Sequence, residues 1–180
     1  MGGCGRDADC KGCLQALRDT CDCGESHWQS VRDLGFDPLH RLVLDLHRCC
    51  CGGYSTKDLK LWDFALFVAM NELGVDHGAA MHGHILALAK TMRMERFGTF
   101  DFLTIRCSKI TPDERELMAA ITDARLDMPQ RTRQAAETIV RCERCAATLV
   151  ALEALGQACR RCEWYNSPAA QMAAYTGELH

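Results

Sequence analysis

Apolar residues recur at helical spacing along most of this chain, and helix-start and helix-end signals separate the segments. The first segment begins at Asp37-Pro38, which joins a capping residue to a proline at the first helical position. Its apolar positions are Leu39, Leu42, Val43 and Leu46. This pattern predicts an amphipathic helix that starts at Pro38.

Two further helices are predicted between residues 55 and 98. Ser55–Asp58 resembles a capping box with Asp in place of the usual Glu. Gly74 suits the end of the helix that this box would open. Asp76 is the candidate cap of the next helix, which is predicted to run to about Arg96. The apolar positions of the first of these helices are Leu59, Trp62, Leu66, Met70 and Leu73.

The C-terminal half contains the clearest start signal, Thr111-Pro112-Asp113-Glu114. It combines a cap, a proline, an acidic first turn and a reciprocal Glu, and its helix is predicted to end near Met128-Pro129. A single long helix is then predicted over residues 130–155, with Gly156 as its end. Its apolar stripe consists of Ile139, Cys142, Ala146, Leu149 and Leu152.

Two segments depart from the helical pattern. Residues 99–107 (TFDFLTIRC) collect aromatic and β-branched residues, which predicts a strand or, because no partner strand is evident, an extended connector. The first 25 residues are rich in Gly and Cys and show little periodicity. The sequence therefore predicts an all-α, single-domain helical bundle of about five or six helices. A Cys-rich irregular segment (residues 1–25) precedes the helical domain (residues 26–180).

Charge and hydropathy limit the possible partners. The formal net charge is −3 and the isoelectric point about 6.1, which argues against binding to nucleic acid or to an anionic membrane surface. The most apolar stretch, LWDFALFVAM, is short and contains Asp63, so it cannot span a bilayer. The first residues contain no apolar signal region. We therefore expect a cytoplasmic protein with no membrane or nucleic-acid partner.

Cysteine is the most informative residue type, with 13 copies in 180 residues. Disulfides are generally unstable in the cytoplasm, and the odd count forbids complete internal pairing, so the cysteines indicate metal binding or redox chemistry. Three Cys-x-x-Cys pairs and one Cys-x-Cys pair are present, and His47 stands beside Cys49–Cys51. The predicted metal ligands are Cys10, Cys13, Cys21, Cys23, Cys142, Cys145, Cys159 and Cys162.

The two C-terminal pairs, Cys142/Cys145 and Cys159/Cys162, are separated by 13 residues, which is close to the spacing of a zinc ribbon. A ribbon requires a β-hairpin between them, but that stretch consists mainly of strong helix formers. We therefore expect the pairs to lie on two helices, each facing thiols from elsewhere. The N-terminal run supplies such thiols and is also the first candidate for a self-contained site.

Three segments of the chain carry a family resemblance: His27–Gly35, the Leu-rich segment 39–46 and Lys60–Phe64. Together they resemble the NifQ family, whose members are helical molybdenum donors in nitrogenase cofactor assembly. The run Cys4-x5-Cys10-x2-Cys13-x7-Cys21 is also similar to the cysteine run that holds the iron–sulfur cluster of that family. Spacings and block order differ from the family pattern. The resemblance implies an iron–sulfur cluster in preference to zinc.

The sequence supports three hypotheses about function. The first is a cysteine-ligated metal-binding protein, with iron–sulfur preferred to zinc, that acts with a protein partner in metal-cofactor assembly, metal handling or redox sensing. The second is a Cu(I)-storing helical bundle with thiols on buried stripes, and the third is a helical interaction module with inert cysteines. No His-Glu-x-x-His, Walker-type or Gly-x-Ser-x-Gly motif is present, so we expect no substrate turnover. The sequence does not specify the oligomeric state.

Overall fold

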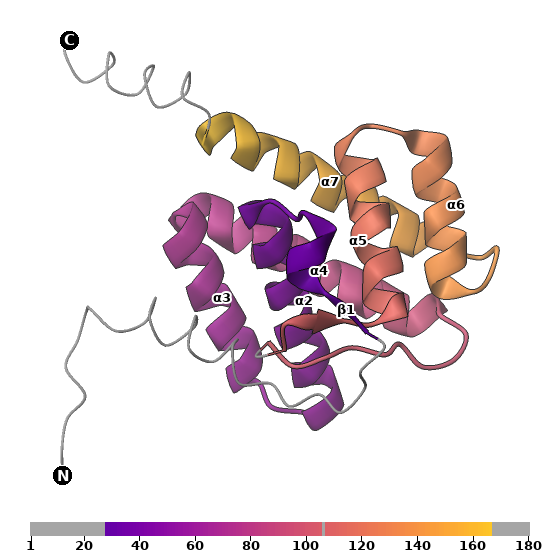
Figure 1. The fold of residues 1–180 in the computed structure, drawn as a ribbon, viewed down its shortest axis with the longest axis horizontal. Helices are drawn as coiled ribbons and strands as arrows, with labels where there is room; N and C mark the ends of the chain where they lie inside the picture. Colours follow the sequence, from indigo (N-terminus) through magenta and orange to yellow (C-terminus); the bar gives the residue numbers. More distant parts are fainter. Residues whose placement is uncertain (1–27, 106, 167–180) are drawn as a thin grey trace, which may run out of the picture.

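The computed structural model describes residues 28–105 and 107–166. Six α-helices dominate this part of the chain, which confirms the predicted all-α bundle (Figure 1). A short 3-10 helix, η1 (Val31–Leu34), precedes them, and strands β1 (Gln29–Ser30) and β2 (Lys109–Ile110) form a minimal antiparallel sheet. The α-helices are α2 (Pro38–Thr56), α3 (Lys60–Leu73), α4 (Val75–Glu95), α5 (Pro112–Arg125), α6 (Pro129–Val140) and α7 (Ala146–Asn166).

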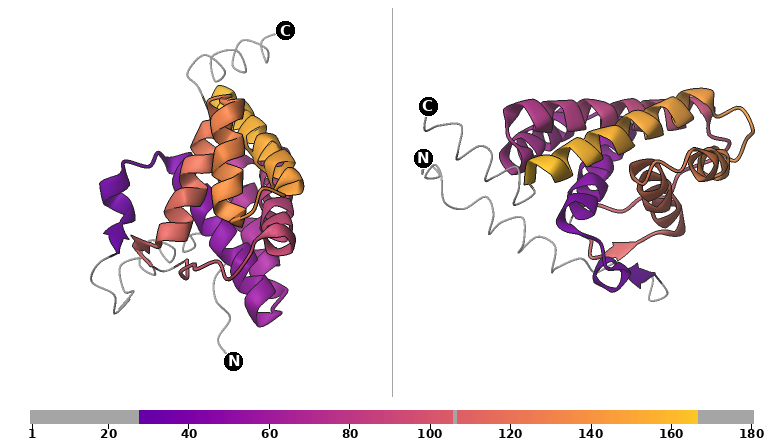
Figure 2. Two further views of the ribbon diagram at one scale, coloured as in Figure 1. Left: turned by 90° about the vertical axis from the view of Figure 1, so that its right-hand side faces the viewer. Right: turned by 90° about the horizontal axis from the view of Figure 1, so that it is seen from above.

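The helices form two groups of three. Helices α2, α3 and α4 pack on one another, and so do α5, α6 and α7. The two groups are joined chiefly along α4 and α7, which lie beside each other in Figure 2. The described core runs through both groups, and its fully buried side chains include Leu44, Leu46, Met81, Ile85, Leu88, Leu117, Met118, Ile121, Ile139, Leu152 and Leu155. Among the described helices, none is both long and apolar enough to cross a membrane.

Two helix starts agree with their predicted caps. The Asp37 side chain accepts a hydrogen bond from the His40 amide at 2.7 Å, and Pro38 is the first residue of α2. Thr111 and Glu114 form the complete capping box at the start of α5. Both signals are local, because donor and acceptor lie within one turn, and so the sequence reveals them.

The predicted capping box at Ser55–Asp58 is wrong. Helix α2 continues through Thr56 and ends at Lys57, whose φ of 59° is left-handed. Asp58 instead accepts a hydrogen bond from the Lys60 amide at 3.0 Å, and no side chain caps α3 at Leu59. Of the two alternatives for residues 99–107, the connector is confirmed and the strand is wrong: the described part is irregular, and the short strand β2 begins only at Lys109.

The predicted long helix over residues 130–155 is also wrong. Helix α6 ends at Val140, and Arg141 adopts a left-handed φ of 56°. A short loop follows, and α7 then runs from Ala146 through Gly156 to Asn166. Gly156 therefore ends no helix. It lies in the interior of α7, where a β-carbon would come within 2.5 Å of the Ala124 carbonyl carbon in α5.

Helix α7 takes its N-terminal cap from another helix. The two carboxylate oxygens of Glu95, the last residue of α4, accept hydrogen bonds from the Ala147 and Thr148 amides at 2.9 and 2.8 Å. A carboxylate at this end of a helix satisfies free amides and complements the helix dipole. Because the end of α4 meets the start of α7, the two helices run antiparallel.

Candidate functional site

A thiol–imidazole pair lies on the inner face of α2. His47 and Cys51 are one helical turn apart, and the Cys51 Sγ lies 3.5 Å from His47 Nε2 and 3.8 Å from Nδ1. His47 is buried and Cys51 is half-buried. Residues four positions apart share one face of a helix, so the turn of α2 alone brings these two groups into contact.

Burial keeps both members of this pair neutral. It lowers the pKa of His47 to about 4, with a smaller contribution in the same direction from the adjacent Arg48. Burial also raises the pKa of the Cys51 thiol far above its usual range, with further upward contributions from Cys50 and Glu114. At neutral pH the pair is therefore a thiol beside a neutral imidazole. It is not the thiolate–imidazolium pair that activates a cysteine nucleophile.

The pair lines a cavity of about 460 Å³. The opposite wall comes from α4, which contributes Ala89 and the buried Met92. The connector between α4 and β2 contributes Phe100 and Phe102. The cavity thus contains a thiol, an imidazole and a thioether, which are all soft or borderline metal donors.

The aromatic part of the wall is held by ring contacts. Phe100 meets the His47 imidazole edge to face, with 5.4 Å between ring centroids. The Arg96 guanidinium lies over the same Phe100 ring, 5.2 Å from its centre. A guanidinium over an aromatic face is favourable because the ring carries negative charge there.

Two acidic residues in the first turn of α5 fix the connector. The Asp113 Oδ2 accepts hydrogen bonds from Arg96 Nη2 at 2.7 Å and from the Asp101 amide at 2.9 Å. The Glu114 carboxylate accepts from the Leu103 and Thr111 amides, each at 3.0 Å. The cavity wall is therefore tied to a helix start at several backbone points.

A buried ion pair completes this support. Arg48 Nε and Nη2 donate to the two Glu114 carboxylate oxygens at 2.7 and 2.8 Å, and both side chains are almost fully buried. The same guanidinium donates to the Cys107 and Lys109 carbonyls at 2.8 and 2.6 Å. Because Arg48 directly follows His47 in α2, the Arg48–Glu114 ion pair ties the part of α2 that carries His47 to the connector.

The predicted C-terminal metal ligands do not converge. Cys142 and Cys145 lie in the α6–α7 loop and not on adjacent turns of a helix, which corrects that prediction, whereas Cys159 and Cys162 lie on α7 as expected of a helical pair. The helical rise places Cys159 about 20 Å along the axis from Cys145. Residues 146–158, which a zinc ribbon would need as a β-hairpin, lie in α7 instead.

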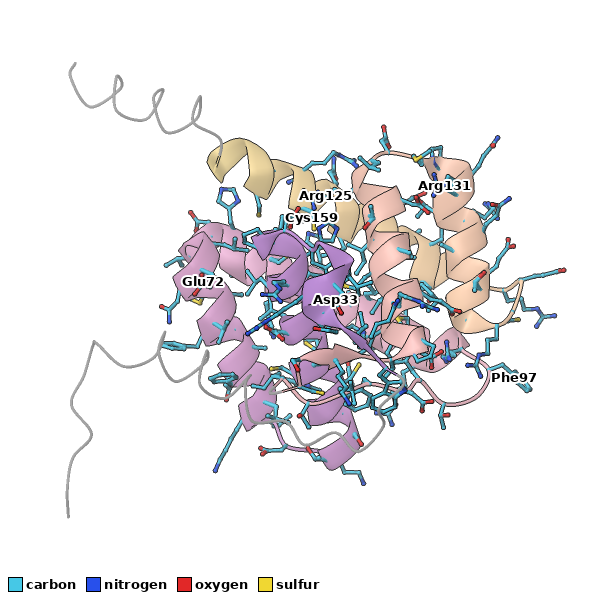
Figure 3. The ribbon with its side chains drawn as sticks, in the orientation of Figure 1. Asp33, Glu72, Phe97, Arg125, Arg131 and Cys159 are labelled. Atoms are coloured by element: carbon cyan, nitrogen blue, oxygen red, sulfur yellow. The ribbon has the colours of Figure 1, made fainter. Side chains whose placement is uncertain are left out.

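The cysteines of α7 are buried thiols. Cys159 lies beside Arg125 where α5 meets α7 (Figure 3), and burial raises its pKa to about 12. Burial also raises the pKa of Cys162 and of Cys145. At neutral pH all three are protonated and packed into the core. The remaining predicted ligands, Cys10, Cys13, Cys21 and Cys23, lie outside the described residues.

Within residues 28–105 and 107–166, no group of three or more His, Cys, Asp or Glu side chains could hold a metal ion. Seven of the cysteines described there are free, and Cys107 is disulfide-bonded. A four-ligand zinc or iron–sulfur site therefore does not lie wholly within this part of the chain.

The sequence contained a signal for His47 and Cys51, since the spacing His-x3-Cys places both on one face of any helix. A Cys-x-x-Cys pattern points only to thiol pairs, so it does not reveal this mixed pair. Met92 could not have been identified, because only the packing of α4 on α2 brings it to the cavity.

No protein-family model, no curated protein and no solved structure matches this chain. The geometry of the site therefore carries the functional argument.

Proposed function

We propose that this protein binds thiophilic metal ions through its cysteines and serves in metal handling or cofactor assembly with a protein partner, without substrate turnover. The observation that carries the proposal is the Cys51 Sγ at 3.5 Å from His47 Nε2, in a cavity that Met92 also lines. For this site we propose Cu(I), because thiolate and thioether donors select it and imidazole suits it as well.

The protonation states support this assignment. A neutral imidazole offers a free lone pair to a metal, and the depressed pKa of His47 keeps it neutral at neutral pH. The Cys51 thiol must lose its proton when the metal binds, so the affinity rises with pH. A soft cation that forms a strong bond to sulfur supplies the energy for that deprotonation, whereas a hard cation such as Mg²⁺ does not.

Burial of the other cysteines is what both the Cu(I) hypothesis and the interaction-module hypothesis require. Cys49 and Cys50 are buried in α2, and burial raises the pKa of each to about 12. Thiols on the inner faces of helices are what a Cu(I)-storing bundle requires. The same residues pack as small apolar side chains, so the interaction-module hypothesis predicts identical burial and differs only in metal content.

The Cu(I) site is tested by titrating the reduced full-length chain with Cu(I) under anaerobic conditions against a chromophoric chelator. We expect Cys51→Ser and Met92→Leu each to lose one tightly bound equivalent. The matched control is Met94→Leu on the same helix, because Met94 is 75% exposed and lies outside the cavity lining. Equal stoichiometry and affinity in all four proteins would remove Cu(I) from this site.

A spectroscopic signal separates this site from other copper-binding thiols in the chain. In a long-range ¹H–¹⁵N correlation spectrum, Cu(I) should shift the ring nitrogens of His47 at the first equivalent in the wild type. The shift should be absent in Cys51→Ser. If copper binds while the His47 ring signals stay in place, the metal is held elsewhere.

The second candidate is the iron–sulfur or zinc site expected from Cys10, Cys13, Cys21 and Cys23, which the NifQ resemblance favours as iron–sulfur. Anaerobic purification with elemental analysis tests it. Bound iron with broad absorption at about 400 nm supports the cluster. Colourless protein with stoichiometric zinc supports zinc, and protein that takes up no metal under any condition supports the interaction module.

A further inference from the structure

The charged lining of the His47–Cys51 cavity is cationic. Lys57, Arg93 and Arg96 line it, with Lys57 and Arg93 exposed at its mouth, and none of the described residues that line it is Asp or Glu. The cavity is therefore a one-sign site within a chain whose formal net charge is −3. Clustered charge of one sign in a concave site concentrates ligands of the opposite sign.

The three cations are not equivalent. Arg96 is committed to the fold, because it pairs with Asp113 and also donates to the Thr99 and Ile139 carbonyls. Lys57 and Arg93 are exposed, and neither forms an ion pair within the described residues. Their charges remain available to a ligand at the mouth.

Arg93 is oriented by an aromatic ring. Its guanidinium carbon lies 5.3 Å from the centre of the Tyr54 ring, and Tyr54 itself packs edge to face on Trp62. Tyr54 lines the cavity as well. Stacking on an aromatic face leaves the edge of the guanidinium free to donate two parallel hydrogen bonds to a carboxylate.

The interior below this mouth is mainly apolar. Ala89, Met92, Phe100 and Phe102 line it, and its volume of about 460 Å³ lies within the range of small-molecule sites. An apolar body with a charged end matches such a cavity, because the body replaces water at the walls while the charge stays at the mouth.

We propose that this cavity binds an organic monoanion with an aromatic or other flat apolar body. The carboxylate, or an equivalent anionic group, pairs with Arg93 and Lys57, and the body lies between Tyr54 and Phe100 above the His47–Cys51 pair. This ligand is separate from the proposed metal and needs no metal to bind. Inorganic phosphate fits less well, because the apolar walls leave most of its oxygens without donors.

The test uses the metal-free, reduced full-length chain and isothermal titration with 2-naphthoate and with its neutral analogue 2-naphthamide. We expect 2-naphthoate to bind and the amide to bind at least about tenfold more weakly, because a hydrogen bond to a charged group is stronger than one to a neutral group. Arg93→Gln and Lys57→Gln should each weaken 2-naphthoate and leave the amide unchanged.

Lys90→Gln is the matched control, because Lys90 is exposed on the same helix as Arg93, carries the same charge and lies outside the cavity lining. It should bind 2-naphthoate as the wild type does. Equal binding of acid and amide, or equal losses in Arg93→Gln and Lys90→Gln, would overturn the proposal. Tighter binding of inorganic phosphate than of 2-naphthoate would overturn it in favour of an inorganic anion. Since no copper is present, these outcomes are independent of the Cu(I) titration.

Discussion

The His47 ring is 1% exposed, and its protonation is therefore linked to folding. In the folded protein burial lowers the pKa to about 4, whereas an unfolded chain would show the ordinary value of 6.5. Between these two pH values the unfolded state binds the extra proton and the folded state does not. The linkage makes the free energy of unfolding fall as the pH drops from about 6.5 to about 4.

We predict that acidification over this window costs up to about 3 kcal/mol through His47 alone, because each pKa unit corresponds to about 1.4 kcal/mol. Urea unfolding at a series of pH values measures the slope directly. His47→Asn should flatten it only in part, since burial also lowers the pKa of His40 and His82. Identical slopes for the variant and the wild type would show that His47 carries no buried neutral ring.

Single residues were predictable where the signal is local. Asp37 and Thr111 cap helices within their own turn, and the sequence identifies both. Lys57 and Arg141 end helices in a left-handed conformation that neither Lys nor Arg favours, so no residue pattern indicates these ends. Met92 belongs to the cavity only through packing between helices, which one sequence does not encode in any short pattern.

At the scale of the elements, the departures from prediction share a cause in tertiary contacts. Glycine is typical of helix ends, yet α7 continues through Gly156. Here the glycine instead lets α5 pack directly against α7. The break between α6 and α7 is supported by Glu95, which is distant in sequence from the amides that it caps. Helical periodicity identified α2 to α5 but merged α6 with the first part of α7, because it does not reveal where a helix ends.

We predict that Gly156→Ala destabilises the protein by about 1–3 kcal/mol, against the usual stabilising effect of Ala in a helix. The new β-carbon would meet the Ala124 carbonyl carbon at 2.5 Å and its side chain at 2.8 Å. Gly83→Ala in α4 is the matched control, because no atom lies within 4 Å of its added β-carbon. It should stabilise by up to about 1 kcal/mol in chemical denaturation. A stabilising Gly156→Ala would contradict the close approach of α5 and α7.

At the scale of the whole molecule, the Arg48–Glu114 pair joins the two groups of helices through the connector. Arg48 belongs to α2 and Glu114 to α5, and between them they bond four backbone groups of residues 103–111. A buried pair of this kind is weak evidence of net stabilisation, but removing one partner leaves a buried charge without compensation.

We predict that Arg48→Met destabilises the protein by about 3–5 kcal/mol, because Glu114 is fully buried and would keep its charge or take up a proton. Adding Glu114→Gln should recover part of the loss, because Gln carries no charge and its single amide oxygen can still accept one of the two amides that bond separate Glu114 oxygens. A double-mutant cycle from urea denaturation measures the coupling. Simple additivity of the two changes would show that the pair does not act as a unit.

Because Glu95 at the end of α4 caps α7, the chain should tolerate cleavage of its backbone in the α6–α7 loop. Arg141 and Arg144 are exposed in the α6–α7 loop and offer trypsin its cleavage sites. After a cut behind Arg144, one fragment retains Glu95 and the other retains the Ala147 and Thr148 amides, while the long α4–α7 interface stays whole. The two pieces should therefore remain one particle, and the α6–α7 loop is the natural place to split this protein into complementing halves or to open it for circular permutation.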